Sequence, residues 1–504
     1  MTVVTRIAPS PTGDPHVGTA YVGLFNYVLA QKAGGRFIFR LEDTDRNRYN
    51  PDSEARIVSM LRWLGLTPDE GPEMGGDRGP YRQSERLDLY RQHAEMLLAS
   101  GHAYRSFETT EDLEAMAREQ KWHGRPQGYD GRGRSVPREE QERRASAGEM
   151  HVIRLRTPDD GETTFKDSVR GTIRWPNSEL RDTVLLKRDG YPTYHLAVVV
   201  DDHLMGVTHV IRAEEWIPST ALHIHLYRAF DWDLPLFVHL PLLRNPDKSK
   251  ISKRKMNTSL ESYRDQGILP EALLNYLATL GWSMPDGREF FSLKELVDVF
   301  ILERLSAGEP VFDIKKLRHF NAKYLREILS LDELADRVEP HFKAAGYSWD
   351  DEDYFLDIID VLRPRTETLN DFTEQARYFF DDDFPYQEEA RKRLSSAQKY
   401  LEDLERQLSM LEFYDYDSVE DLLREYVQSQ AVGMGKVLQP LRAALTGRTQ
   451  APGVSDLLTI LGKQRALQRI GRALNAINAG LPDDHPQKGK ETSDKGERRA
   501  GATG

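Results

Sequence analysis

The sequence contains no cysteine among its 504 residues. Disulfide bonds and thiolate metal sites are therefore excluded, and a reducing cytoplasm is the compartment in which we expect the protein to act. No apolar run reaches about 18 residues, the length that a membrane-spanning helix needs. The first residues also lack a basic segment followed by an apolar one. We therefore expect neither a membrane span nor a secretory signal.

Positive charge is also in deficit, because 81 Asp and Glu residues outnumber 69 Lys and Arg residues and leave a net charge of −12. This balance excludes a general attraction for nucleic acid, so any such binding must depend on local basic patches. Hydrophobic residues make up 39% of the chain and charged residues 30%. Such a composition at this length predicts about two to four globular domains.

Residues 1–255 alternate short strand-like runs with helical periods, apart from one interruption. A predicted strand over residues 2–8 is followed by apolar residues at helical spacing and by a second strand over residues 36–41. This strand–helix–strand order predicts parallel strands joined by a right-handed crossover. Residues 81–187 break the pattern with helices and a Gly-rich basic stretch, so we interpret them as an insertion.

Beyond residue 255 the pattern is almost entirely helical. We predict one helical domain over residues 256–321 and two more over residues 322–380 and 381–480. Residues 481–504 are polar and rich in glycine, a composition that predicts a disordered tail. We find no internal repeat.

Chemically unusual residues cluster where the predicted strands end, which is where open parallel sheets bind ligands. The four strands lead into PSPTGDPHVG at 9–18, EDTD at 42–45, AEEW at 213–216 and PLLRNPDKSKISKRK at 241–255. In the first loop, prolines stiffen the chain and Gly18 permits close approach of a ligand. Backbone N–H groups at the start of the following helix favour a phosphate, and His16 adds a donor. The alternative is an ordinary turn with a capping histidine.

Basic side chains point to the same kind of ligand. Within DKSKISKRK, Lys250, Lys253 and Arg254 surround Ser252 and are suited to a polyphosphate, although a solvated basic turn is the alternative. Arg6 shares one side of its strand with Ala8 and Ser10. It needs an anion as partner unless it is a solvent-exposed edge residue. No G-x-x-x-x-G-K-[ST] loop is present, which excludes a P-loop.

We predict no metal site from protein side chains. Glu42, Asp43 and Asp45 are better explained by one carboxylate that reaches a ligand amine and two that form local salt links. His223 and His225 are two residues apart on a predicted helix and therefore do not share a face.

Five segments, RIAPSPTGDPHVGT, LEDTD, YPTYHLA, VIRAEEW and LLRNPDKSKISKRK, resemble in this order the bacterial glutamyl-tRNA synthetases, a family of class I aminoacyl-tRNA synthetases. The resemblance extends to about residue 480. It implies an α/β, Rossmann-type catalytic core over residues 1–80 and 188–255, with an inserted acceptor-stem-binding domain over residues 81–187. A helical stem-contact domain over 256–321 and an all-α anticodon-binding region over 322–480 would follow.

The resemblance implies ATP-dependent ligation of L-glutamate to tRNA(Glu). Glutamate would attack the α-phosphate of ATP, and the resulting glutamyl-adenylate would pass its acyl group to the terminal adenosine of the tRNA. ATP with Mg²⁺, L-glutamate and tRNA(Glu) are the implied ligands, and we expect a monomer. Some members hold zinc in the insertion through cysteines, so we expect no zinc here. The family also generally needs bound tRNA before it activates glutamate.

Site residues follow from the matched motifs. The catalytic residues implied are His16, Gly18, Lys250, Ser252, Lys253 and Arg254. The ATP site implied comprises Ala8, Ser10, His16, Gly18, Glu215, Trp216, Leu242, Leu243, Lys250 and Lys253. The glutamate site implied comprises Arg6, Ala8, Ser10, Glu42, Tyr194 and Arg212, with Arg6 favoured for the side-chain carboxylate and Glu42 for the ammonium. Arg365 is the candidate for recognition of an anticodon base.

Three positions depart from the family pattern. Thr19 replaces a second histidine, Arg254 replaces a serine of the basic loop, and Val198 replaces a polar residue found in some relatives. Alternative interpretations are an enzyme that also charges tRNA(Gln), a glutamine enzyme, a shorter relative that glutamylates a tRNA base, a nucleotidyltransferase and a non-catalytic tRNA-binding homologue. The helical second half disfavours the glutamine enzyme, whose anticodon-binding part is a β-barrel, and also the short relative, which lacks that half.

Overall fold

The computed structural model describes residues 2–251 and 259–480. The chain divides into two compact units, Met1–Tyr324 and Leu325–Gly504, which are described separately. This division lies close to the boundary expected at residue 321. The predicted tail over 481–504 lies outside the described residues.

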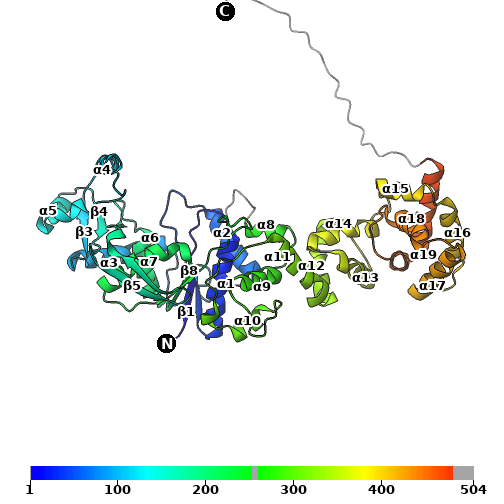
Figure 1. The fold of residues 1–504 in the computed structure, drawn as a ribbon, viewed down its shortest axis with the longest axis horizontal. Coiled ribbons are helices and arrows are strands. Elements are labelled where there is room, and N and C mark those ends of the chain that lie inside the picture. The colour runs from blue at the N-terminus through cyan, green and yellow to red at the C-terminus, as the bar shows by residue number, and fades with distance from the viewer. Residues whose placement is uncertain (1, 252–258, 481–504) are drawn as a thin grey trace, which may run out of the picture. The chain divides into compact units, whose positions relative to one another are not determined.

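The first unit contains a parallel sheet built as expected around a strand–helix–strand unit (Figure 1). β1 (Val4–Ile7) pairs in parallel with β2 (Arg36–Phe39), and Arg6 lies opposite Ile38. β8 (His209–Ala213) pairs in parallel with β9 (Leu236–Leu240), and Arg212 lies opposite His239. The backbones of Val4 and Thr208 join the two pairs, because the Thr208 N–H donates to the Val4 carbonyl at 3.0 Å. The carboxyl ends of β1 and β8 therefore meet at one edge.

The segment predicted as an insertion contributes to two different sheets. Its antiparallel sheet has the order β3 (Ala103–Ser106), β4 (Val152–Leu155) and β7 (Val184–Leu186). The hairpin of β5 (Glu162–Asp167) and β6 (Gly171–Pro176) instead joins the sheet of β8 and β9, where Asp167 on β5 lies opposite Phe237 on β9. The expected domain range 81–187 therefore contains a hairpin that belongs by its hydrogen bonds to the core.

Helices of the first unit surround these strands. They are α1 (Val17–Lys32), α2 (Pro51–Trp63), α3 (Leu87–Ala99), α4 (Thr110–Trp122), α5 (Arg138–Ser146), α6 (Tyr194–Leu204), α7 (Ile217–Ala229), α8 (Leu260–Asp265), α9 (Pro270–Gly281), α10 (Leu293–Val299) and α11 (Ile314–Lys323). Local sequence explains their starts: Asn50 caps α2 just before Pro51, and Thr109 forms a capping box with Asp112 at α4.

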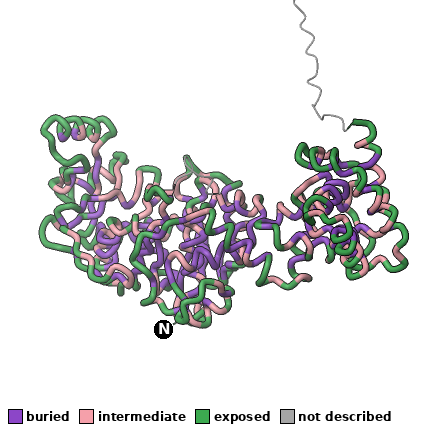
Figure 2. The backbone as a smooth tube through the Cα atoms, turned by 45° about the vertical axis from the view of Figure 1, so that its right-hand side comes forward, coloured by how far each residue is buried: buried purple, intermediate pink, exposed green. Residues whose placement is uncertain are grey.

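The main core lies between α1, the β1–β2 pair and α9. Leu24, Phe25 and Val28 of α1 are fully buried together with Phe37 and Leu273. Figure 2 shows purple, buried tube concentrated in the middle of the first unit. Burial on this scale fixes α1 against the sheet and thereby fixes where its N-terminus lies.

The second unit is helical, and no strand occurs between residues 325 and 480. Its helices are α12 (Leu331–Ala344), α13 (Glu352–Leu362), α14 (Leu369–Phe380), α15 (Glu388–Leu394), α16 (Gln398–Met410), α17 (Tyr416–Ser429), α18 (Met434–Thr446) and α19 (Val454–Asn478). Ser330 and Thr368 form capping boxes at α12 and α14. Within the described part of the chain, no helix is both long and apolar enough to cross a membrane.

Candidate functional site

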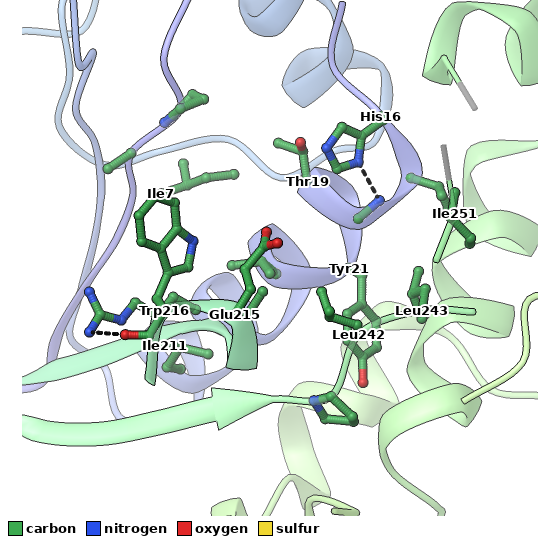
Figure 3. Close-up of a pocket in the computed structure, with 18 of the residues that line it drawn as sticks. Ile7, His16, Thr19, Tyr21, Ile211, Glu215, Trp216, Leu242, Leu243 and Ile251 are labelled. Carbon is green, nitrogen blue, oxygen red and sulfur yellow. Dashed lines mark hydrogen bonds between the residues drawn. The ribbon is translucent and has the colours of Figure 1, made fainter. Parts of the chain in front are cut away.

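A cavity of about 370 Å³ opens where β1, β8 and β9 end and α1 begins. The segments that the sequence singled out line it from five separate stretches of chain, and Figure 3 labels residues from three of these stretches. The lining residues are Arg6, Ile7, Ala8, Pro9, His16, Val17, Gly18, Thr19, Tyr21, Val22, Glu42, Tyr194, Ile211, Arg212, Ala213, Glu215, Trp216, Pro241, Leu242, Leu243, Lys250 and Ile251.

His16 is the N-cap of α1, and its Nδ1 accepts a hydrogen bond from the Gly18 N–H at 3.0 Å. In the neutral ring the proton must therefore be on Nε2. The capping interpretation is thus correct for Nδ1, and the cap occupies one of the backbone N–H groups that we expected to meet a phosphate. A Cβ at position 18 would lie 2.8 Å from His16 Cε1. A side chain at position 18 would therefore force the folded-back imidazole to shift, whatever the ligand.

Arg6 is buried, with only 4% of its surface exposed, so the solvent-edge interpretation is wrong. Its Nε donates to Asp202 Oδ1 at 3.1 Å and its Nη2 to Asp202 Oδ2 at 3.3 Å. Arg40 Nη1 also donates to Asp202 Oδ1, at 2.7 Å, and Arg40 Nη2 donates to Glu42 Oε1 at 3.2 Å. The anion that Arg6 requires is therefore supplied by the protein. Burial raises the pKa of Glu42, although Arg40 and Arg6 partly offset this.

Arg212 is equally buried but lacks such a partner. Among residues 2–251 and 259–480, no carboxylate forms an ion pair with it. Its guanidinium donates instead to Tyr194 Oη at 2.9 Å, Thr220 Oγ1 at 2.7 Å and His239 Nε2 at 3.1 Å. A fourth bond, at 3.3 Å, reaches the Trp216 carbonyl and is drawn in Figure 3. This buried cation therefore faces the cavity with neutral acceptors around it.

Aromatic and charged groups close the other side of the cavity. The rings of Tyr194 and Trp216 are 4.6 Å apart, and Trp216 retains 38% exposure. Lys250 Nζ pairs with Glu215, and both side chains remain largely exposed. Such an exposed pair contributes little to stability and exchanges easily for another partner. The Leu242 N–H donates to Glu214 Oε1 at 3.0 Å and is therefore already used.

Most of the expected site residues line this one cavity. Ser10 is exposed and is not among the lining residues. Ser252, Lys253 and Arg254 lie outside the described residues. Val198 is buried in α6, whereas Thr19 lines the cavity.

Comparison with known proteins identifies the family. Residues 2–319 match the family described as tRNA synthetases class I (E and Q), catalytic domain, and residues 333–474 match an anticodon binding domain. A glutamate–tRNA ligase of Thermus thermophilus is 57% identical over 472 residues, which cover 94% of this chain and 100% of that protein. The chain belongs to the glutamate–tRNA ligase family.

Two further members of the glutamate–tRNA ligase family support this assignment. One from Deinococcus radiodurans is 50% identical over 475 residues, covering 93% of this chain and 98% of that protein. The crystal structure of a glutamate tRNA ligase from Elizabethkingia meningosepticum in complex with its amino acid has a TM-score of 0.88 at 35% identity. The match between the two structures covers 95% of this chain and 100% of the Elizabethkingia chain. The expected class I catalytic fold with a helical anticodon region is thereby confirmed.

Sequence reasoning missed the buried residues behind the cavity wall. Asp202, His223 and His239 contact its arginines, yet each lies in an apolar run where such a side chain is usually a core residue. Tyr21 and Ile211 line the cavity but are also ordinary core residues by pattern. Only the three-dimensional arrangement distinguishes them.

Metal ligation is not indicated by the described residues. Between residues 2 and 251 and between 259 and 480, no group of three or more His, Asp or Glu side chains is arranged to hold a metal ion.

In the second unit, within the anticodon-domain match, Arg365 lies at the end of a short 3₁₀ turn (Arg363–Arg365) after α13. It lines two cavities, of about 460 and 660 Å³. Arg448 lines the larger one, and the pKa of nearby Arg442 is lowered by its burial and by the charge of Arg365. Within residues 325–480 none of these three arginines forms an ion pair with a carboxylate.

Proposed function

We propose that this protein ligates L-glutamate to tRNA(Glu) at the expense of ATP, through a glutamyl-adenylate. One observation carries the proposal. The cavity of the first unit gathers two buried arginines and one buried carboxylate beside a helix N-terminus and a basic segment. Glutamate brings two carboxylates and one ammonium, and ATP brings the phosphates, so the charges of cavity and ligands are complementary.

The glutamate site is proposed at Arg6, Glu42, Tyr194 and Arg212, with Ala8 and Ser10 at the end of β1. Arg6 and Arg212 bind the carboxylates, and ionised Glu42 binds the ammonium. The charge of Arg6 is already balanced by Asp202, so Arg6 serves mainly to orient the ligand through hydrogen bonds. Arg212 has a charge that no described carboxylate balances. A neutral amide cannot replace the side-chain carboxylate as the anion beside the buried arginines, which disfavours glutamine.

The ATP site is proposed on the other side of the same cavity. His16 Nε2–H and the start of α1 at Gly18 hold the phosphates, and Lys250 exchanges its Glu215 partner for them. Ser252, Lys253 and Arg254 of the same segment are assigned by family resemblance. Glu215, Trp216, Leu242 and Leu243 hold the adenosine. ATP enters as its magnesium complex.

The reaction needs no covalent enzyme intermediate. A carboxylate oxygen of glutamate attacks the α-phosphorus of ATP, and the bond to the bridging oxygen of pyrophosphate breaks. A hydroxyl of the terminal ribose of the tRNA then attacks the acyl carbon, and AMP leaves. The protein contributes alignment and stabilisation of charge on the departing phosphates, which is the task of His16 and the lysines.

The tRNA is proposed to contact several parts of the chain. Residues 81–187 bind the acceptor end and residues 256–321 contact the stem. Within residues 322–480, Arg365 recognises a base of the anticodon, for which exposed single-stranded bases are suitable targets. Three arginines without carboxylate partners in an acidic protein support this placement. We propose that the enzyme acts as a monomer.

The decisive experiment is ATP–pyrophosphate exchange and aminoacylation with the purified protein. We expect exchange and charging with glutamate, dependent on tRNA(Glu), and little of either with glutamine. Efficient exchange with glutamine would overturn the substrate assignment. Charging of tRNA(Gln) at a similar rate would identify the enzyme as one that serves both tRNAs, and no exchange at all would identify a non-catalytic homologue.

A further inference from the structure

We propose that His239, oriented by Asp167, is a positioning residue that holds Arg212 toward the substrate as a cation without a counter-ion among the described residues. The inference rests on the proposed function, because it concerns the glutamate site of that reaction. Neither residue lines the cavity, and they act only through Arg212.

The hydrogen bonds fix the proton on His239. Arg212 Nε carries a proton at every accessible pH and lies 3.1 Å from His239 Nε2, so that nitrogen must accept. The ring proton is therefore on Nδ1, which lies 2.7 Å from Asp167 Oδ2. Asp167 also accepts from the His239 backbone N–H at 3.1 Å. The carboxylate thereby selects the one imidazole tautomer that Arg212 can use.

The surroundings keep the imidazoles neutral. Burial lowers the pKa of His239, and the Asp167 bond opposes this only in part. The pKa of His223, whose Nδ1 lies 3.5 Å from Arg212 Nη1, is lowered by burial and by Arg212. Its other nitrogen contacts His195, whose pKa falls to about 4 through burial and the charge of Arg212. Every group that contacts this guanidinium is therefore uncharged.

Comparison with Arg6 shows what this arrangement achieves. Arg6 is oriented by a direct two-point bond to the Asp202 carboxylate, which also neutralises it. Arg212 is oriented by an imidazole, and the carboxylate lies one residue farther away. Its position is thus fixed while its charge is left to a ligand. An anion bound there gains the full interaction with a desolvated guanidinium.

The carboxylate comes from the β5–β6 hairpin. Asp167 ends β5 at the point where β5 pairs with β9, and the Ser168 N–H donates to the Phe237 carbonyl at 2.9 Å. Asp167 Oδ1 also accepts from the N–H groups of Val169 and Arg170 in the hairpin turn. The hairpin therefore serves to position the carboxylate behind the glutamate site.

Two variants at one position test the proposal. His239→Gln retains an acceptor for Arg212 and a donor for Asp167, whereas His239→Leu has neither. We expect the KM for glutamate in aminoacylation to rise about 10- to 100-fold in His239→Leu, the range for a lost hydrogen bond to a charged group. The KM for ATP should stay unchanged, and His239→Gln should restore most of the glutamate affinity. Asp167→Asn should behave like His239→Leu.

His225→Leu is the matched control. His225 Nε2 contacts Thr163 Oγ1 of the same hairpin at 2.8 Å but does not contact Arg212. We expect this variant to lose stability in chemical denaturation while keeping the wild-type KM for glutamate. If His239→Leu and His239→Gln shift the KM values for glutamate and ATP equally, as a purely structural loss would, the proposal is wrong.

A spectroscopic measurement is independent of activity. In the wild-type protein labelled with ¹⁵N-histidine, two-bond ¹H–¹⁵N correlations assigned through His239→Gln should show a neutral ring protonated on Nδ1. A proton on Nε2 would overturn the proposal even if all variants gave the expected KM values. If the wild-type protein shows this tautomer but never attaches glutamate to tRNA, the proposed function is wrong. The inference that His239 positions Arg212 would still hold.

Discussion

At the scale of single residues, His16 combines a structural and a chemical task in one ring. Nδ1 caps α1 through the Gly18 N–H, and this bond leaves the proton on Nε2. The cap stabilises the helix, whereas the donor is proposed to bind the phosphates of ATP. The two tasks depend on different nitrogen atoms and are therefore separable by substitution.

We expect His16→Asn to keep the cap and lose the chemistry. Asparagine is a favoured N-cap residue, so the free energy of unfolding should stay near wild type, while His16→Ala should lose about 0.5–2 kcal/mol. Both variants should lose ATP–pyrophosphate exchange by about 100-fold or more, the usual cost of removing one donor to a developing charge. Chemical denaturation and exchange assays measure the two effects. Wild-type exchange in His16→Asn would remove the imidazole from the mechanism.

The protonation of Glu42 should make the KM for glutamate depend on pH at the acid end of the range. Burial raises the pKa of this carboxyl, so it takes up a proton as the pH falls while the solution pH is still above about 4.3, the ordinary value for glutamate. The neutral acid cannot balance the substrate ammonium, and the KM for glutamate should therefore rise toward acid pH. Glu42→Gln should show a high KM for glutamate that does not change over the same acid range of pH. If the KM of Glu42→Gln still rises toward acid pH with the same midpoint, the titrating group is the substrate or another residue, and Glu42 is not responsible.

At the scale of elements, α6 organises the buried charges behind the cavity. Tyr194 at its start lines the cavity, and near its end Asp201 and Asp202 both form ion pairs with Arg40. Asp202 binds Arg6 and Arg40, whereas Asp201 accepts from Arg86, Gln83 and Tyr90 at the start of the insertion. One helix thus connects the proposed glutamate site with the inserted segment.

We expect Asp202→Asn to be strongly destabilising. It removes the one ion-pair partner that Arg6 has among the described residues and deprives Arg40 of one, and removing one partner of a buried pair typically costs about 3–5 kcal/mol. Asp45→Asn is the control, since Asp45 pairs with Arg48 on the surface and should cost about 0–1 kcal/mol. Urea denaturation of both variants makes the comparison. Equal small losses would show that Arg6 and Arg40 find other acceptors.

The sequence predicted those elements whose contacts are local or whose motifs are unusual. The β1–α1–β2 unit follows from periodicity, and its parallel pairing is confirmed. The meeting of Arg212 with His16 and Lys250 in one cavity followed from strand ends and family resemblance. The β5–β6 hairpin was placed in the insertion, because its partner β9 lies far along the chain and no local pattern encodes that pairing. Asp202 and His239 were missed because a polar residue in a buried run reveals its partner only in three dimensions.

At the scale of the whole molecule, a net charge of −12 must coexist with binding of a polyanion. Among the described residues, many basic side chains pair with acids, whereas others, at different places in both units, form no ion pair with a carboxylate. Arg212 is one in the first unit. Arg365, Arg442 and Arg448 form a group in the second, where described carboxylates pair with other arginines such as Arg465 and Arg469. Binding is thus directed by local charge, because the overall field repels RNA.

Arg365→Gln tests whether the second unit selects the tRNA while the first performs the chemistry. Arg365 is exposed beside two cavities, so its loss should barely change the free energy of unfolding. We expect kcat/KM for tRNA(Glu) to fall about 5- to 150-fold, as for loss of about 1–3 kcal/mol of base recognition, and discrimination against other anticodons to relax. The KM values for ATP and glutamate at saturating tRNA should not change. Aminoacylation of tRNA(Glu) transcripts with single anticodon substitutions measures all of these quantities. Arg377→Gln is the control, because Arg377 pairs with Asp381 on the surface of the same unit. Unchanged discrimination among the transcripts would remove Arg365 from anticodon recognition, and a raised KM for glutamate would contradict the separation of tasks.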